Sequence, residues 1–531
     1  MTCCPSLRRW LSATLTALIL GVVLAVVLFS GRPDRKEDAQ AADAKADAAR
    51  SWPTFGGGLQ RNMVNTFEKG MPTDWDVENA KNIKWSVKLG SKAYGGPIIS
   101  GGKVFVGTNN DAPRDPKVKG DKGVLMCFDE ATGKFLWQVI HDKLKAGQVN
   151  DWPHEGICSS SYVEGNRLWY VSNRCEVVCR DTDGKEIWSL DMIGKLDVFP
   201  HNLAVCSPLV VGDTLFVITS NGVDEGHKNI PKPGAPSFIA VNKKTGEVLW
   251  TKNQPSANVK PGAELKNLLD RGLVLMHGQW SNPVYAEVDG RGEIIFPGGD
   301  GWLRALDPKN GDLIWEFDGN PKDAIYALGG KGERNDYLAT PVVHDNKLYI
   351  GLGQDPEHDF GVGHFWCIDL VKATKTGGDV SDELAAEGPG GAQVGKPNKN
   401  SAKVWHVGGM LNPAPKKGRK WTFGRTISTA AVADGLCYVG ELEGILHCFD
   451  ANTGKEYWQH DLSKQTWSSP YVVDGKVYMG SDNAYLCIFE HGKEKKKIAE
   501  IDMGAVVRAT PVAANGVLYV MTEEQLYAIK K

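Results

Sequence analysis

Ten polar and aromatic residues stand out because their side chains could bind a ligand and because each follows or precedes a strand-like apolar run. They are Glu155, Asn202, Asn221, His277, Trp280, Asn282, Asp300, Arg425, Trp467 and Arg508. Carboxylates, amides, imidazoles and guanidinium groups can fix a ligand by hydrogen bonds, and indole rings can stack on a flat one. The sequence holds no hydrolase elbow, nucleotide-binding loop or zinc-protease helix. These residues therefore indicate binding more readily than catalysis.

Histidines are also concentrated in these loops. Six of the 12 histidines lie there, namely His154, His201, His227, His277, His358 and His364. His358 and His364 flank Asp359, so a metal site is conceivable. The competing interpretation is that spaced loop histidines are solvated or cap a backbone group. No CxxC framework for a metal is present.

A repeated phrase positions these loops. Residues 124–137, 237–250, 302–315 and 445–458 each read as an apolar strand, a polar turn containing Thr-Gly or Asn-Gly, and a strand carrying Trp. Alternating apolar residues predict strands, and Gly allows the tight turn that joins them. The Trp is expected on an outer strand, where it can wedge against a neighbouring unit.

Eight inner strands are expected to begin at similar points of the repeat. The starts are Pro97, Ser161, Pro208, Pro283, Pro341, Ala430, Pro470 and Pro511. The last intervals, from 430 to 470 and from 470 to 511, are about 40 residues, the length of a four-stranded propeller blade. The sequence therefore predicts an all-β, eight-bladed β-propeller, with seven blades as the alternative.

The final repeat lacks its Trp strand, and residues 82–89 supply one around Trp85. We expect this N-terminal strand to complete the last blade and close the ring, which removes an exposed sheet edge. In such a ring, loops before the inner strands and after the second strands surround one mouth. The ten candidate residues are expected there.

The cysteines follow the repeat. Cys127, Cys179, Cys367, Cys448 and Cys487 share one position of the third strand, where the other blades have Ala. We interpret this position as a crowded packing site that needs a small residue. Cys437 is likewise expected in the core. Cys158, Cys175 and Cys206 are left as candidates for a single disulfide, and both states remain open.

The N-terminus predicts export. Arg8 and Arg9 precede residues 10–29, which carry no charge and are long enough to span a bilayer. We favour a membrane anchor over a cleaved signal peptide for residues 1–30, a tether for residues 31–50, and a propeller from 51 to 531 outside the cytoplasmic membrane. The net charge of -3 provides no basic field for nucleic acid.

The Asp/Asn-x-x-Thr/Asn-Gly-x-x-x-Trp phrase resembles the tryptophan motif of the pyrroloquinoline-quinone (PQQ) propeller repeat. Residues 51–62 also look like the start of such proteins, so the resemblance covers 51–531. The family includes quinoprotein alcohol dehydrogenases and non-catalytic assembly propellers of the BamB type. Fold alone does not decide between them.

For a dehydrogenase, the resemblance implies PQQ on the ring axis and Ca²⁺ held by Glu, Asn and Asp. Glu155 and Asn221 fall near the Glu and Asn positions. Ser281 and Asn282 stand where carboxylates are expected, and no adjacent cysteine pair occurs in the propeller. Neither residue can act as a general base unaided.

We therefore expect a binding or scaffold module for a protein or a small ligand, with no cofactor. The alternative is an oxidoreductase that depends on PQQ and Ca²⁺. A second alternative is an enzyme acting on polysaccharide at the channel mouth, where Trp, Arg and Asp residues gather.

Overall fold

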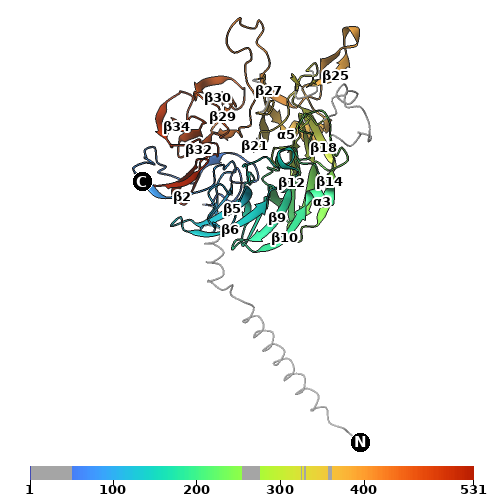
Figure 1. Ribbon diagram of the computed structural model, residues 1–531. Coiled ribbons are helices and arrows are strands. Elements are labelled where there is room, and N and C mark those ends of the chain that lie inside the picture. Colours follow the sequence, from blue (N-terminus) through green and yellow to red (C-terminus); the bar gives the residue numbers. More distant parts are fainter. Residues whose placement is uncertain (2–50, 254–274, 325, 328–330, 357–360) are drawn as a thin grey trace. The chain divides into compact units, whose positions relative to one another are not determined.

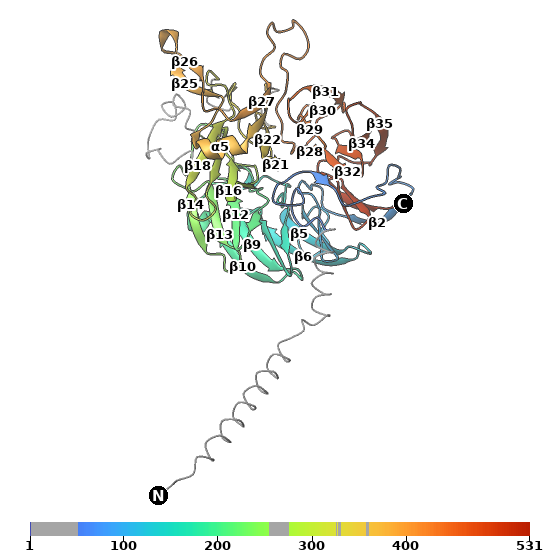
Figure 2. The same ribbon diagram turned by 180° about the vertical axis from the view of Figure 1, so that it is seen from behind.

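The computed structural model describes Met1 and residues 51–531, except 254–274, 325, 328–330 and 357–360. Its sheets follow one another around a ring in chain order (Figures 1 and 2). Eight sheets form the blades, and each contains four antiparallel blade strands. The predicted all-β, eight-bladed propeller is confirmed. The predicted segments 10–29 and 31–50 lie outside the described residues.

The first four blades run from the inner to the outer strand in chain order. Their strands are β3 (Ile98–Ser100), β4 (Lys103–Asn109), β5 (Lys122–Asp129) and β6 (Phe135–Asp142); β7 (Tyr162–Glu164), β8 (Arg167–Val171), β9 (Glu176–Asp181) and β10 (Glu186–Asp191); β11 (Leu209–Val211), β12 (Thr214–Ile218), β13 (Phe238–Asn242) and β14 (Val248–Lys252); β15 (Val284–Val288), β16 (Arg291–Pro297), β17 (Trp302–Leu306) and β18 (Leu313–Asp318).

The last four blades follow the same order, except that an N-terminal strand completes the eighth. Their strands are β21 (Val342–His344), β22 (Lys347–Leu352), β23 (His364–Asp369) and β27 (Lys403–Gly408); β28 (Ala431–Ala433), β29 (Leu436–Gly440), β30 (Ile445–Asp450) and β31 (Glu456–Asp461); β32 (Tyr471–Val473), β33 (Lys476–Gly480), β34 (Tyr485–Glu490) and β35 (Lys497–Asp502); β36 (Val512–Ala514), β37 (Val517–Met521), β38 (Gln525–Ile529) and β2 (Ile83–Lys88).

Elements outside the blade pattern are short. They are β1 (Val64–Asn65), η1 (Gly147–Val149), α3 (Met192–Leu196), β19 (Tyr326–Ala327), β20 (Lys331–Gly332), α5 (Leu370–Thr376), β24 (Gly378–Asp379), β25 (Glu383–Glu387), η3 (Pro389–Gly391) and β26 (Gln393–Pro397). The β25–β26 hairpin projects from the ring (Figure 2). In the described part of the chain, no helix has the length and apolar character needed to span a bilayer.

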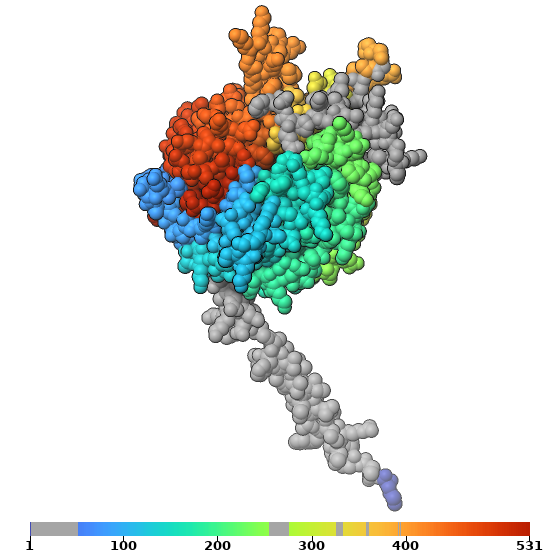
Figure 3. Space-filling view, viewed as in Figure 1, coloured from blue at the N-terminus to red at the C-terminus, as the bar shows by residue number. Residues whose placement is uncertain are grey.

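The ring closes as predicted. β2 pairs antiparallel with β38, so Trp85 lies opposite Ala528 in the last blade. The N-terminal part of the propeller lies against its C-terminal blades in the space-filling view (Figure 3). Because β2 covers the outer edge of β38, the eighth blade has the same four strands as the others.

The small residues of the third strands are explained by the side chains opposite them on the outer strands. Cys127, Cys179 and Cys448 lie directly opposite the repeat tryptophans Trp137, Trp188 and Trp458. Ala or Cys leaves room for the indole, because opposite side chains in an antiparallel pair lie about 5 Å apart. The seventh blade differs, since Cys487 pairs with Glu500. All cysteines among the described residues are free thiols, so Cys158, Cys175 and Cys206 form no disulfide.

Most repeat tryptophans join neighbouring blades. The indole N–H of six of them donates to a carbonyl in the outer turn of the next blade, at 2.9–3.1 Å; the pairs are Trp85 with Glu130, Trp137 with Thr182, Trp188 with Lys243, Trp250 with Pro308, Trp405 with Ala451, and Trp458 with Gly492. The predicted wedge is confirmed for these blades. Trp315 instead donates to Glu293 of its own blade, because α5 and β24 replace the simple turn of the fifth blade.

A central segment, residues 52–65, lies on the ring axis, since it touches the inner-strand region of all eight blades. Its partners, in blade order, are Ile99, Val163, Ser207, Tyr285, Val343, Val432, Val472 and Ala513. Val64 and Asn65 also form β1, a strand parallel to β32. The axis is therefore filled below the mouth by the chain's own backbone.

Candidate ligand-binding site at the channel mouth

A pocket of about 390 Å³ lies on the ring axis. Every blade contributes to its lining at two positions that precede the inner strand, and Phe55 of the central segment also lines it. Alternate residues of an extended chain point the same way, so residues two and four before each strand both face the axis. The pocket is therefore built from two rings of side chains.

The hydroxyl ring comprises the residues two before each inner strand, and most are small and polar. They are Gly96, Ser160, Ser207, Asn282, Thr340, Thr429, Ser469 and Thr510. Neighbouring members bond to one another. Ser160 N donates to Ser207 Oγ at 3.0 Å, Asn282 Nδ2 to Thr340 Oγ1 at 2.8 Å, and Ser469 N to Thr510 Oγ1 at 3.0 Å. These hydrogen bonds connect blades, so this ring is chiefly structural.

The upper ring comprises the residues four before each inner strand. They are Tyr94, Cys158, Val205, Trp280, Leu338, Ile427, Trp467 and Arg508. Three are aromatic and three are aliphatic, and they break the repeat symmetry of the ring below. Pockets lined mainly by such side chains, with few polar groups, suit small organic ligands.

Arg508 organises one wall of the pocket. Its guanidinium group lies 4.9 Å from the Trp467 ring and donates to the Tyr94 hydroxyl at 2.7 Å. It also pairs with Asp482 at 2.8 Å and with Glu523 at 3.2 Å. These carboxylates and Tyr94 raise the Arg508 pKa against the opposing effect of burial. The charge is thus balanced within the protein, and the residue holds two aromatic rings in place.

Glu155 is the acidic member of the pocket lining in the described part of the chain. Its Oε2 is buried, and no described residue forms a hydrogen bond with it. Burial raises the pKa of Glu155, while a hydrogen bond from Tyr94 opposes that rise. Such a carboxyl group is available to a ligand that offers a hydrogen-bond donor or a cation.

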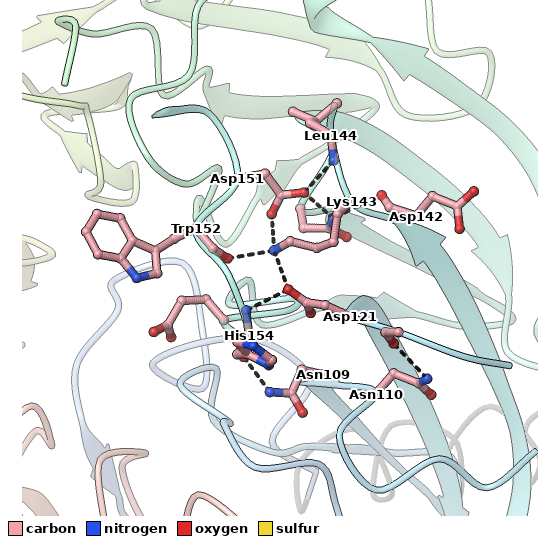
Figure 4. A network of polar contacts seen from close by, with 12 residues as sticks. Asn109, Asn110, Asp121, Asp142, Lys143, Leu144, Asp151, Trp152 and His154 are labelled. Atoms are coloured by element: carbon pink, nitrogen blue, oxygen red, sulfur yellow. Dashed lines mark hydrogen bonds and ion pairs between the residues drawn. The ribbon is translucent and has the colours of Figure 1, made fainter. Parts of the chain in front are cut away.

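A polar network fixes the loop that carries Trp152 and Glu155 into the pocket (Figure 4). Lys143 Nζ donates to the Trp152 carbonyl at 2.7 Å and pairs with buried Asp151. Asp121 accepts from the His154 N–H at 2.7 Å. These bonds tie the loop to the first blade, so the pocket wall is supported by side chains outside it.

The ten predicted residues divide into two groups. Those that line the pocket are Glu155, Trp280, Asn282, Trp467 and Arg508. Those that do not line it are Asn202, Asn221, His277, Asp300 and Arg425.

Side chains of the second group form hydrogen bonds and ion pairs outside the pocket. Asn221 accepts from Phe199 N at 2.9 Å and donates to Lys232 O. Asp300 pairs with Arg304 at 2.7 Å, and Arg425 pairs with Glu443 at 2.9 Å.

Several pocket residues escaped the sequence analysis. Tyr94, Lys92 and Trp152 line the pocket but belong to longer, irregular loops. Counting four residues back from each inner strand would have found Tyr94 and its seven counterparts. No spacing from an inner strand would have found Lys92 and Trp152, because the direction of their side chains depends on the fold of the loop.

A separate cluster of histidines lies behind Trp280. His201, His227 and His277 are all buried, and one nitrogen of each lies within 4.8 Å of the others. Trp280 stacks on His201 and donates its indole N–H to the His201 carbonyl at 3.1 Å. The conceivable metal site of His358 and His364 is not tested, because His358 lies outside the described residues. His364 Nδ1 lies 2.9 Å from His406 Nε2.

Comparison with known proteins identifies the family of the chain. The family profile of the outer membrane protein assembly factor BamB matches residues 121–369 and 391–531. The chain belongs to this family. Its repeats are PQQ-like propeller repeats, as the Trp motif suggested.

Relatives of two kinds share this repeat. BamB of Yersinia pestis is 22% identical over 67% of this chain and 77% of its own length. The quinoprotein alcohol dehydrogenase PedH of Pseudomonas putida is 21% identical over 82% of this chain and 80% of its length. A europium-containing methanol dehydrogenase shares the fold, with a TM-score of 0.57, 13% identity, and coverage of 92% of this chain and 100% of its own.

The Ca²⁺ ligands that the quinoprotein resemblance implies are not assembled in this family member. Glu155 lines the pocket, but Asn221 does not, and both ends of its amide are bound to backbone groups. Asn282 is held in the hydroxyl ring by Ser207 N and Thr340. These residues do not fit a Ca²⁺-PQQ centre as they stand.

Proposed function

We propose that the protein is an extracytoplasmic binding module that takes a small, flat, weakly charged ligand into the pocket at the channel mouth. The upper ring is the observation that carries this proposal. It places Tyr94, Trp280 and Trp467 around one cavity of about 390 Å³, within the size range of small-molecule sites. The aliphatic members of the ring complete an apolar wall.

The charges of the pocket favour a neutral or weakly cationic ligand. Arg508 is neutralised by Asp482 and Glu523, and Lys92 pairs with Glu523 at 2.9 Å. Glu155 offers a carboxyl oxygen without a partner among the described residues. A ligand with a planar ring and one donor group would stack on the indoles and satisfy this oxygen.

A protein partner can use the same pocket by inserting one aromatic side chain. The family of assembly factors to which the chain belongs supports a role in binding. Glycoside hydrolysis is less well supported, because that reaction commonly uses two carboxyl groups. Glu155 is the acidic residue that the described pocket lining provides.

Indole is a suitable first probe, because it is planar, nearly neutral and carries one N–H donor. Ligand-observed saturation-transfer NMR of wild-type protein with indole should give a signal. Trp467→Ala should abolish it, because the substitution removes one of the indoles on which the ligand is proposed to stack and also the ring that Arg508 lies over. Trp421→Ala is the matched control, since Trp421 is half-buried but does not line the pocket.

An unchanged indole signal in Trp467→Ala would contradict the proposal. Loss of the signal in both tryptophan variants would also contradict it, since binding would not then be specific to the pocket. The quinoprotein alternative is tested in parallel by absorbance titration with PQQ and Ca²⁺ and a dye-linked alcohol assay. Stoichiometric PQQ binding with alcohol-dependent dye reduction would replace the binding-module proposal with an oxidoreductase.

Export is tested separately. A fusion of the full chain to a periplasmic reporter phosphatase should be active if the propeller crosses the cytoplasmic membrane. Release of the propeller by a protease added to spheroplasts would place it on the outer side. Protection from that protease would contradict export.

A further inference from the structure

We propose that His201, His227 and His277 form a binding site for a borderline divalent transition-metal ion, with Zn²⁺ as the most suitable. The three imidazoles come from the third and fourth blades and converge behind Trp280. Their ring centroids lie 4.6 Å (His201–His277), 4.8 Å (His201–His227) and 5.4 Å (His227–His277) apart. Three protein nitrogens with an open fourth position are a common arrangement for zinc.

Hydrogen bonds to backbone carbonyls fix which nitrogen can bind a metal. His201 Nδ1 lies 2.9 Å from Val223 O, and His277 Nδ1 lies 3.0 Å from Gly278 O. A carbonyl oxygen only accepts, so Nδ1 of His201 carries the proton and its Nε2 presents a lone pair. His277 Nε2 lies 3.5 Å from the carboxylate of Asp355, so that nitrogen can bind a metal only when its ring is neutral and protonated on Nδ1. Metal-binding histidines are oriented in the same way, by donating their second nitrogen to a backbone or carboxylate oxygen.

The Nε2 atom of His201 is an independent indication that this cluster binds a ligand. His201 is fully buried, and its Nε2 makes no hydrogen bond with any described residue. A buried acceptor without a donor costs free energy unless something binds it. A metal ion shared with the neighbouring imidazoles would satisfy it. Simple ring packing would leave that cost uncompensated.

The distances require only a small adjustment. The three candidate nitrogens lie within 4.8 Å of one another. In a tetrahedral zinc site, nitrogens at their usual bond lengths are separated by about 3.4 Å. Rotations about the side-chain bonds of one or two histidines would close this difference. The backbone anchors of His201 and His277 would keep their rings facing the ion.

Two buried carboxylates lie beside the His277 ring, one near each of its nitrogens. Asp355 is 3.5 Å from its Nε2, and Asp336 is 3.7 Å from its Nδ1. Asp355 is placed to add an oxygen ligand, and Asp336 to orient the ring. Nitrogen ligands favour Zn²⁺ and its first-row neighbours over Ca²⁺, which prefers oxygen. The site is therefore distinct in chemistry from the Ca²⁺ centre that the quinoprotein resemblance implies.

Cobalt titration tests this site directly. Full-length protein, freed of its purification tag and treated with a chelator, should bind one Co²⁺ per chain with visible d–d absorption of a four-coordinate complex. His201→Gln and His277→Gln keep a similar volume and should each weaken binding by at least about 100-fold. His460→Gln is the matched control, because His460 lies on the outer strand β31 and packs against Phe489.

Two outcomes would overturn the proposal. One is the absence of stoichiometric Co²⁺ binding by the wild-type protein. The other is unchanged Co²⁺ binding in His201→Gln. If both glutamine variants fail to fold by circular dichroism, X-ray absorption at the zinc edge of the wild-type protein decides: three imidazole ligands support the site, and fewer than three reject it. Neither measurement depends on the pocket ligand.

Discussion

At the scale of single residues, the buried carboxyl group of Glu155 is expected to make the stability of the protein depend on pH. Burial raises the pKa of Glu155 above its ordinary value, so the folded protein holds the proton more tightly than the unfolded chain does. Folding then takes up protons at this group between the ordinary pKa of about 4.5 and the higher folded-state pKa. The contribution of this group to stability is present at low pH and is lost as pH rises through its folded-state pKa.

Glu155→Gln should therefore stabilise the protein at high pH. Gln has a similar shape and no charge to bury. The melting temperature of the variant should exceed that of the wild type at pH 8, and the difference should shrink toward pH 4. Differential scanning calorimetry across this range measures it. The same variant should bind a cationic ligand less well, which is a common trade-off at binding sites.

The control for this prediction is Glu247→Gln, since Glu247 is exposed in the outer turn of the third blade. Its melting temperature should follow that of the wild type at every pH. An equal shift in both glutamine variants, or a Glu155→Gln curve parallel to the wild type, would show that the buried charge is not the cause.

At the scale of elements, the outer turn of each blade is shaped by the tryptophan of its neighbour. Gly133 adopts a φ of +72°, and a Cβ there would lie 2.7 Å from the Trp85 ring. The turn therefore needs glycine twice, for its backbone conformation and for the indole that packs on it. Because Trp85 belongs to β2, this contact also fixes the closing strand against the first blade.

Gly133→Ala should lower the free energy of unfolding by about 2–4 kcal/mol, combining the left-handed backbone with a forced displacement of the indole. Gly165→Ala is the matched control, because Gly165 has a φ of +57° and a Cβ added there would meet no atom of the described residues within 4 Å. It should cost about 1 kcal/mol. Urea denaturation of both variants measures the difference, and equal losses would remove the indole from the explanation.

The strands and the closure of the ring were largely predictable from the sequence, whereas some contacts between blades were not. Each inner strand begins one residue after its predicted start, as at Ile98 and Val512. The starts could be found because turn residues in the local sequence mark where a strand begins. The sequence predicts that each repeat Trp wedges against the next blade but not which group its N–H meets. Trp315 donates to Glu293, since α5 and β24 occupy the place of the turn that the other blades offer. Local patterns do not encode how an insertion packs.

The candidate site was predicted only in part, for a related reason. Trp280, Trp467 and Arg508 were found because they precede inner strands, and alternate residues there face the axis. Asn221 and Asp300 occupy loops on the same side, but their side chains satisfy backbone or ion-pair partners instead. Which loop residue turns inward depends on bonds that form only in the folded ring.

At the scale of the whole molecule, residues before the first blade hold the ring together in two ways. β2 completes the eighth blade, and the central segment bonds to the inner strand, or to the residues just before it, in every blade. Arg61 anchors that segment. It is 0% exposed and donates hydrogen bonds to the carbonyls of Phe55, Ser207, Pro208 and Pro283 and to the Thr54 hydroxyl.

Arg61→Met should destabilise the entire ring rather than one blade. Burial lowers the Arg61 pKa to about 10, so the guanidinium group is still charged at neutral pH and donates all its hydrogen bonds. Met fills much of the same space but leaves several buried carbonyls without a donor, at about 1–3 kcal/mol for each group. We expect a loss of at least about 3 kcal/mol in urea denaturation, with a single cooperative transition, because the third and fourth blades share this anchor.

Arg291→Met provides the comparison, since Arg291 is exposed at the start of β16 and should change stability little. Two results would count against the anchoring role of Arg61. A loss below about 1 kcal/mol would mean that water replaces the guanidinium group at the carbonyls. A biphasic transition in Arg61→Met would mean that one part of the ring loses stability while the rest keeps it. Arg61 would then support only the blades that it touches and not the whole ring.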